Sequence, residues 1–228
     1  MRALFAPILA GATFGDRLAA CAGAGVGIGL TAIVATVVLA GGPLALLLVA
    51  PMGARAVLVF AVFASPLAQP WPVIGGNIVS AFVGVTASSL VQSQALAAGL
   101  AVGGAILAMS LLRCLHPPGG AAALTPVIGG PAVAAAGWLF PIVPVGINAV
   151  ILATTGVLFH RLTRHSYPHR PAPASVTAPL HDATPHSDDL DAALADLGET
   201  FDIGRDDLAR LFESVRRHSA SRRGSGDK

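Results

Sequence analysis

Long apolar stretches, separated by short segments of proline, glycine or polar residues, fill the first 160 residues of the chain. A helix that crosses a lipid bilayer needs about 20 mainly apolar residues. Four stretches qualify, at residues 18–42, 73–91, 95–112 and 138–160. This pattern predicts an all-α integral membrane protein with about four transmembrane helices.

Two further apolar stretches contain proline and glycine at positions that an ordinary spanning helix does not tolerate. The stretch at 44–64 carries Pro51, Gly53 and Arg55 in its middle, and the stretch at 114–136 contains two prolines and two glycines directly after His116. The chain crosses the membrane four times if both stretches are re-entrant, and six times if both cross. We favour four, because 114–136 makes a poor span.

The two broken stretches begin alike, which indicates a weak internal repeat. Residues 51–58 (PMGARAVL) resemble 117–124 (PPGGAAAL), and residues 72–77 (PVIGGN) resemble 144–148 (PVGIN). Each half then consists of a spanning helix, a broken segment and a second spanning helix. Two-span units would be parallel repeats and three-span units inverted repeats, and the sequence leaves this choice open.

Charge is distributed very unevenly along the chain. Only 11% of all residues are charged, against about a quarter in a typical soluble domain. Up to residue 160 the charged side chains are Arg2, Asp16, Arg17, Arg55 and Arg113. A soluble helix needs a polar outer face, so the outer surface of the 1–160 domain must meet lipid.

Basic residues flank this membrane domain on both sides. Arg2 and Arg17 lie at its start, and Arg161, Arg164 and Arg170 follow its last span. Positively charged flanks favour the cytoplasmic side of a membrane. We therefore expect a multi-pass protein of the plasma (inner) membrane with both termini in the cytoplasm.

The remainder of the chain has a different composition. Residues 161–187 are rich in Pro, His, Ser and Ala, which predicts a flexible linker. Apolar residues at helical spacing over 188–218 predict a small amphipathic helical hairpin, with its second helix at about 205–217. The final stretch, 219–228, is expected to be disordered.

The broken stretches are the strongest candidates for a binding site. Irregular backbone at membrane depth is tolerated only where protein or a water-filled cavity satisfies its polar groups. Amides at Gly53, Ala54, Gly119 and Gly120 would open two half-helices, and helix N-termini attract anions. Alternatively, the proline and glycine residues mark turns between spans.

Four side chains complete the candidate substrate-binding set. Arg55 has no Asp or Glu between residues 18 and 160 to neutralise it, so its partner is a carbonyl, a lipid phosphate or a bound anion. Alternatively, Arg55 snorkels to the headgroups. His116 could donate to an anion or carry a proton, or could cap a helix. Asn77 and Asn148 are either site residues or hydrogen-bonding groups between helices.

Several functional classes lack their motifs in this sequence. There is no nucleotide-binding loop, no metal-ligand cluster and no catalytic triad within the membrane domain. We therefore expect no enzymatic activity, cofactor, metal or nucleic-acid partner. Glycines spaced four apart at 23–29 and 99–103 predict close helix packing, either within one chain or in a homo-oligomer.

Residues 115–121 (LHPPGGA) resemble the signature of the HPP family of integral membrane proteins. Residues 50–54 (APMGA) and 65–76 (SPLAQPWPVIGG) agree with it, so the resemblance covers roughly residues 5–160. It implies a compact domain of four transmembrane helices and a transport role, since plant plastid and cyanobacterial relatives are associated with nitrite. Some relatives carry paired CBS domains after a linker that residues 189–213 resemble, but we expect no such module here.

These observations lead to one expected function and one alternative. We expect a transporter or channel for a small inorganic anion, with nitrite as the first candidate. The alternative is a non-transporting membrane adaptor or sensor that acts through its C-terminal helical tail. The alternative predicts that Arg55 faces lipid.

Overall fold

The computed structural model describes residues 14–38, 51–170, 189, 192–194, 196 and 205–225. Every regular element in these ranges is helical, which confirms the predicted all-α class. The chain divides into two units, Gly15–His169 and a second unit that combines Met1–Phe14 with Arg170–Lys228. The first unit corresponds to the predicted membrane domain.

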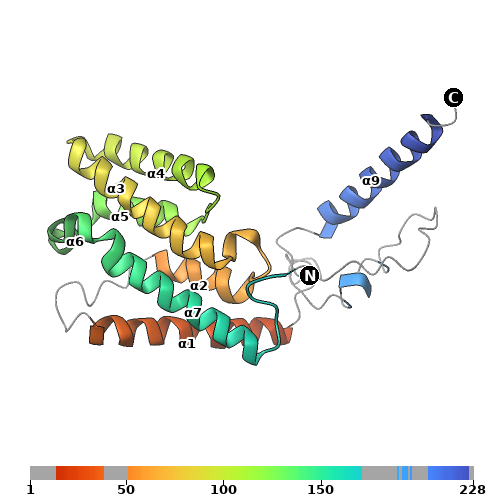
Figure 1. Ribbon diagram of the computed structural model, residues 1–228, viewed down its shortest axis with the longest axis horizontal. Helices are drawn as coiled ribbons and strands as arrows, with labels where there is room; N and C mark the ends of the chain where they lie inside the picture. Colours follow the sequence, from red (N-terminus) through yellow and green to blue (C-terminus); the bar gives the residue numbers. More distant parts are fainter. Residues whose placement is uncertain are drawn as a thin grey trace, which may run out of the picture. The chain divides into compact units, whose positions relative to one another are not determined.

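Four helices in the described ranges are long and apolar enough to cross a membrane, as predicted. Two of them begin with a proline-led π-helical turn, η3 or η5. The spans are α1 (Phe14–Val38), η3 (Pro72–Gly76) with α3 (Asn77–Leu90), α4 (Gln94–Leu111), and η5 (Pro141–Gly146) with α7 (Ile147–Leu162). These long helices lie side by side in Figure 1.

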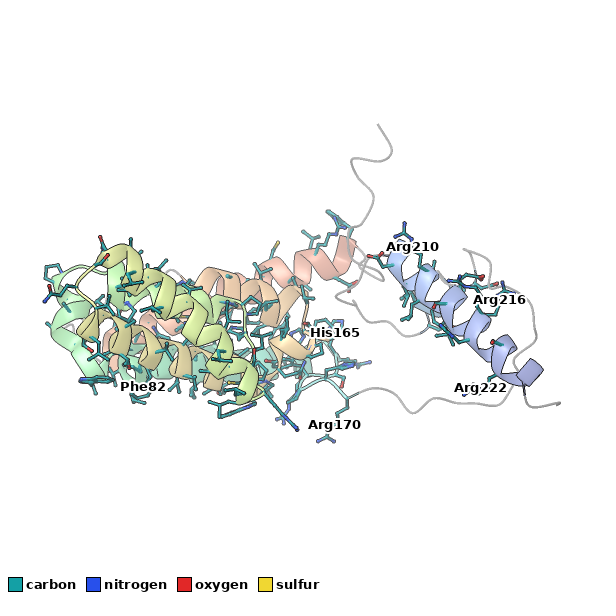
Figure 2. All side chains as sticks on the ribbon, turned by 90° about the horizontal axis from the view of Figure 1, so that it is seen from above. Phe82, His165, Arg170, Arg210, Arg216 and Arg222 are labelled. Carbon is teal, nitrogen blue, oxygen red and sulfur yellow. The ribbon has the colours of Figure 1, made fainter. Side chains whose placement is uncertain are left out.

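The outward faces of these helices are apolar, as a lipid-facing surface requires. Phe82 projects from α3 and is labelled in Figure 2. Large exposed apolar side chains occur on every long helix, among them Val26, Ile33, Leu100, Leu107, Val150 and Leu158. An aqueous environment would penalise such continuous apolar exposure, so the structure agrees with a membrane location.

Both broken stretches form short helices. The first contains α2 (Pro51–Ala61), which leads through η2 (Pro66–Ala68) to η3. The second contains α5 (Pro118–Ile128), followed by α6 (Pro131–Ala136) and η4 (Gly137–Leu139), with a bend of 95° between α5 and the pair that follows. Pro131 has no N–H to continue the α5 hydrogen-bond ladder, which accounts for the break.

One end of the membrane unit, named here the Trp71 end, gathers the start of α3, the end of α4 and the segment after α7. The Trp71 indole N–H donates to the Leu112 carbonyl at 3.3 Å. The Tyr167 hydroxyl donates to the Ala68 carbonyl at 2.8 Å. A Cβ at Gly23 would lie 2.9 Å from the Phe159 ring, so the start of α1 also lies near this end.

The opposite end, named the Gln94 end, contains the start of α4 and the end of α5. The Gln94 side-chain amide donates to the Val127 carbonyl at 3.4 Å. Along α5, Gly119 lies against Ser80 and Ala123 lies against Gly84, so α5 runs parallel to α3. Helix α5 therefore carries the chain from the Trp71 end to the Gln94 end.

These contacts fix the directions of the helices and bear on the choice between the two crossing schemes. Helix α1 leaves the Trp71 end, and the chain is back at that end after α2, where α3 begins. In the same way α4 ends at the Trp71 end, α5 leaves it, and α7 returns. Both broken segments thus connect opposite ends of the unit, as the six-crossing alternative requires, while four helices in the described ranges are long enough to cross a membrane alone.

The order of elements supports the internal repeat and identifies it as inverted. Each half contains a long helix, an 11-residue helix that begins with proline, and a proline-led turn that continues into a long helix. Each element in the second half runs opposite to its counterpart. The helix starts pair Pro51 with Pro118, one residue from the pairing that the sequence repeat suggests. Arg55 and Ala122 then occupy equivalent buried positions.

The helix spacing depends on small residues where α3 and α5 meet. A Cβ at Gly84 would collide with the Ala123 carbonyl. Gly23 and Gly27 of α1 pack against Phe60, which confirms close intramolecular packing for one predicted glycine pair.

The second unit contains α9 (Arg205–Ser225), which carries Arg210, Arg216 and Arg222 (Figure 2). The Arg216 side chain donates twice to Glu213, at 2.8 and 3.1 Å. This pairing lowers the pKa of the Glu213 carboxyl. Because arginine, alanine and glutamate favour helix, α9 extends beyond residue 217 into the stretch predicted to be disordered. Residues 189, 192–194 and 196 are helical, while the rest of the predicted hairpin and residues 171–187 lie outside the described ranges.

Candidate functional site

Arg55 is the most unusual side chain of the membrane unit. It lies on the buried face of α2, with Met52, Ala56 and Val59, and its relative exposure is 0%. None of its three guanidinium nitrogens has a hydrogen-bond partner among the described residues. A buried ion is normally paired and hydrogen-bonded, because its desolvation costs several kcal/mol. The protein therefore holds a cation with unused hydrogen-bonding capacity inside the membrane domain.

Burial of Arg55 bears on the competing interpretations. A snorkelling or lipid-facing arginine would be exposed on the outer surface, and Arg55 is not. Gly53 and Ala54 lie on the exposed face of the same helix, so only their backbone amides could belong to a site shared with Arg55. These amides lie in the first turn of α2, where N–H groups have no partner within the helix.

His116 lies between α4 and α5 and is also fully buried. Its Nδ1 is 2.9 Å from the Leu67 carbonyl, which can only accept, so Nδ1 donates. Its Nε2 has no hydrogen-bond partner in the described part of the chain. The Arg55 guanidinium interacts electrostatically with this ring. The fold thus brings the key residues of both broken segments together.

Glycines allow the helices to close around His116. A Cβ at Gly76 would lie 2.9 Å from the Cβ of His116, and one at Gly119 would lie 2.6 Å from the Ser80 hydroxyl. Ser80 is fully buried, and its hydroxyl has no hydrogen-bond partner among the described residues. Ser80 is not among the site residues predicted from the sequence. Ser80 lies one helical turn after Gly76, and this spacing could have indicated that both residues face the same cluster.

The remaining predicted residues take different positions. Gly120 is half-buried, and a Cβ at this position would lie 3.9 Å from the Val102 side chain, so Gly120 lies at the margin of this cluster. Asn77 begins α3 directly after Gly76, is fully buried, and donates to the Val73 carbonyl. Asn148 is buried near the start of α7, the position that the inverted repeat relates to the start of α3.

The loop at Leu67, which accepts the His116 hydrogen bond, is itself fixed by the segment after α7. Ala68, next to Leu67, accepts from the buried Tyr167 hydroxyl, and the Gln69 side chain accepts from the His169 amide at 2.8 Å. Burial raises the pKa of Tyr167. Residues 163–169 therefore belong to the membrane unit, whereas composition had assigned them to a flexible linker. Their polar character concealed these contacts in the sequence.

Helix α2 is anchored at its C-terminal end as well. His160 of α7 donates from Nε2 to the Val59 carbonyl at 2.8 Å, one of the last carbonyls of α2. The His160 ring lies 4.5 Å from Phe63 and 5.3 Å from Tyr167, centroid to centroid. The helix that carries Arg55 is thus held in a fixed position by aromatic packing and one buried hydrogen bond.

Comparison with known proteins supports the membrane assignment. The model of the HPP transmembrane region matches residues 10–168. Two proteins of Dictyostelium discoideum, both described as transmembrane proteins, are 40% and 36% identical over 126 residues, or 53% of this chain. The matched region spans 44% and 40% of these relatives. No solved structure matches the chain. Because the family model covers more than half of its length, the chain belongs to the HPP family of transmembrane proteins.

Proposed function

We propose that this protein carries a small inorganic anion across the membrane, with nitrite as the first candidate. The observation that carries the proposal is the fully buried Arg55 guanidinium, which no described residue pairs by a hydrogen bond. No Asp or Glu occurs between residues 18 and 160, so the counter-charge has to come from outside this part of the chain. A small anion supplies both the charge and the acceptors.

The chemistry of the cluster suits a planar oxyanion. A guanidinium presents a rigid fork of N–H donors that matches two oxygens of one ion. The Ser80 hydroxyl of α3, which lies against Gly119 of α5, is a further uncharged donor. Such a set binds nitrite or nitrate in two-point contact, whereas a lysine would act only as a point charge.

The architecture around the cluster supports movement of the anion. Inverted repeats with broken helices at their interface are a recurring plan in secondary transporters, because the two halves can rock around a central site. In this chain the two 11-residue helices α2 and α5 contact each other, one from each repeat. The adaptor hypothesis required a lipid-facing Arg55, and its burial argues against that hypothesis.

Nitrite flux into proteoliposomes tests this function. We expect saturable flux for the wild type, and a decrease of about 10- to 100-fold at low nitrite for Arg55→Ala, because a hydrogen bond to a charged group contributes about 1.5–3 kcal/mol. Arg161→Ala removes an exposed arginine at the end of α7 and serves as the matched control. Flux that is equal in both variants, or absent from folded, inserted wild type, would contradict the proposal.

A further inference from the structure

The hydrogen bond from His116 to Leu67 determines what this ring can offer an anion. Because the carbonyl accepts, the only ring proton of neutral His116 is on Nδ1, 2.9 Å from that oxygen. The other nitrogen, Nε2, then carries a lone pair and has no hydrogen-bond partner among the described residues. A lone pair repels an anion. Only the protonated ring can donate from Nε2.

The charges around His116 make its proton depend on the anion. From α2, the Arg55 cation acts on the ring, and it opposes a second positive charge. The neighbouring loop contributes the Cys114 thiol and the exposed Arg113. From η3, Gly76 lies close to His116 and carries no charge. The chain has no acid between residues 18 and 160 to compensate.

We infer that the site takes up one proton with each anion, so that the protein is a proton–anion symporter. This inference rests on the proposed function. Burial and the Arg55 charge both oppose protonation of His116, and an anion that binds the Arg55 guanidinium cancels the second of these. The Nε2 lone pair then accepts a proton from the aqueous side, and the new N–H donates to the bound anion.

Release reverses these steps. When the anion leaves Arg55, the repulsion between the two cations returns and the proton leaves Nε2 for water. The Nδ1 proton stays on the His116 ring throughout and remains donated to the Leu67 carbonyl. Binding of the proton and binding of the anion thus favour each other reciprocally. One anion and one proton carry no net charge, so the transport is electroneutral and is driven by a pH gradient.

Proteoliposome flux with an internal pH indicator tests the coupling, with nitrite as the probe and protein-free liposomes subtracted to remove passive entry of nitrous acid. We expect nitrite to acidify the lumen in step with its entry. Flux should rise up to about tenfold for each unit fall in external pH near neutrality, the slope for one bound proton. A potassium diffusion potential set with valinomycin should leave the flux unchanged.

His116→Gln identifies the proton carrier, since the amide can still bond to Leu67 but does not titrate. We expect this variant either to lose flux or to move nitrite without protons, in a manner driven by membrane potential. Wild-type flux that is insensitive to pH and follows the potential would overturn the symport and leave the anion pathway intact. Coupled flux that persists in His116→Gln would overturn the role of His116. Absence of any wild-type flux would remove both the proposed function and the symport.

Discussion

Two buried side chains, Arg55 and His116, have hydrogen-bonding groups that the described residues do not satisfy. Most buried polar groups in folded proteins are satisfied, because each unsatisfied one costs about 1–3 kcal/mol and more if it is charged. Their proximity in a domain with almost no other charge is therefore informative. The Ser80 hydroxyl, which also has no hydrogen-bond partner among the described residues, lies against Gly119 at the start of α5.

Tyr167 gives a direct test of the packing against the Leu67–Ala68 segment, to which His116 is bonded. It is the single tyrosine of the chain, so the tyrosinate absorbance reports on it alone. Burial raises its pKa, which means that the folded protein favours the protonated phenol. We expect the tyrosinate band to appear well above the ordinary pKa of about 10 in the folded protein, and near 10 after unfolding.

The raised pKa of Tyr167 fixes the direction in which folding stability changes with pH. Because the folded state keeps the proton, stability contributed by Tyr167 is complete below pH about 10 and declines as the pH rises above that value. Tyr167→Phe should remove this alkaline decline. A tyrosine that titrates at its ordinary pKa in folded protein would show that residues 163–169 do not pack against the loop.

At the scale of elements, the α3–α5 contact sets how closely the two repeats approach. Gly84→Ala places a methyl group against the Ala123 carbonyl, which neither helix can move aside locally. Overpacking costs about 1–3 kcal/mol, which outweighs the roughly 1 kcal/mol that alanine gains over glycine in a helix. We expect a lower Tm in detergent.

Gly99→Ala is the matched control, because nothing lies within 4 Å of a Cβ at that position on α4. It should leave Tm unchanged or raise it by the helix-propensity gain. Equal effects of both substitutions would show that α3 and α5 are not in close contact.

The sequence was sufficient to predict the four long helices, because an uninterrupted apolar stretch has few alternatives to a spanning helix. It also identified both proline-led short helices. It could not show how they connect the ends, since an 11-residue helix is too short to be recognised as crossing. That information lies in long-range contacts such as Gln94 with Val127. Ser80 and Tyr167 were missed for the same reason.

At the scale of the molecule, the directions of the helices predict an inverted repeat with six passes. The Val91–Ser93 turn between α3 and α4 then lies at the Gln94 end, opposite to the segment that follows α7. In a four-span protein with two re-entrant segments, the same turn would lie on the side of both termini.

Thiol labelling distinguishes these topologies. Gln92→Cys, in a chain whose Cys21 and Cys114 are replaced, should react with an impermeant reagent only from the side opposite to a cysteine at Arg170. Reaction of both positions from one side would contradict the six-pass arrangement. That result would not bear on the α3–α5 contact, which the Gly84→Ala measurement tests separately.

The most direct test of an anion site at Arg55 is the thermal stability of Arg55→Met with and without nitrite. Methionine fills a similar volume without charge, and replacing a buried ion by a well-packed apolar side chain is often neutral or stabilising. We expect Arg55→Met to have an equal or higher Tm in gluconate buffer. Nitrite should raise the Tm of the wild type, since a ligand stabilises the state that binds it, and should have no effect on the variant. A variant that is strongly destabilised in gluconate, yet still stabilised by nitrite, would show that Arg55 is a structural residue and that the anion binds elsewhere.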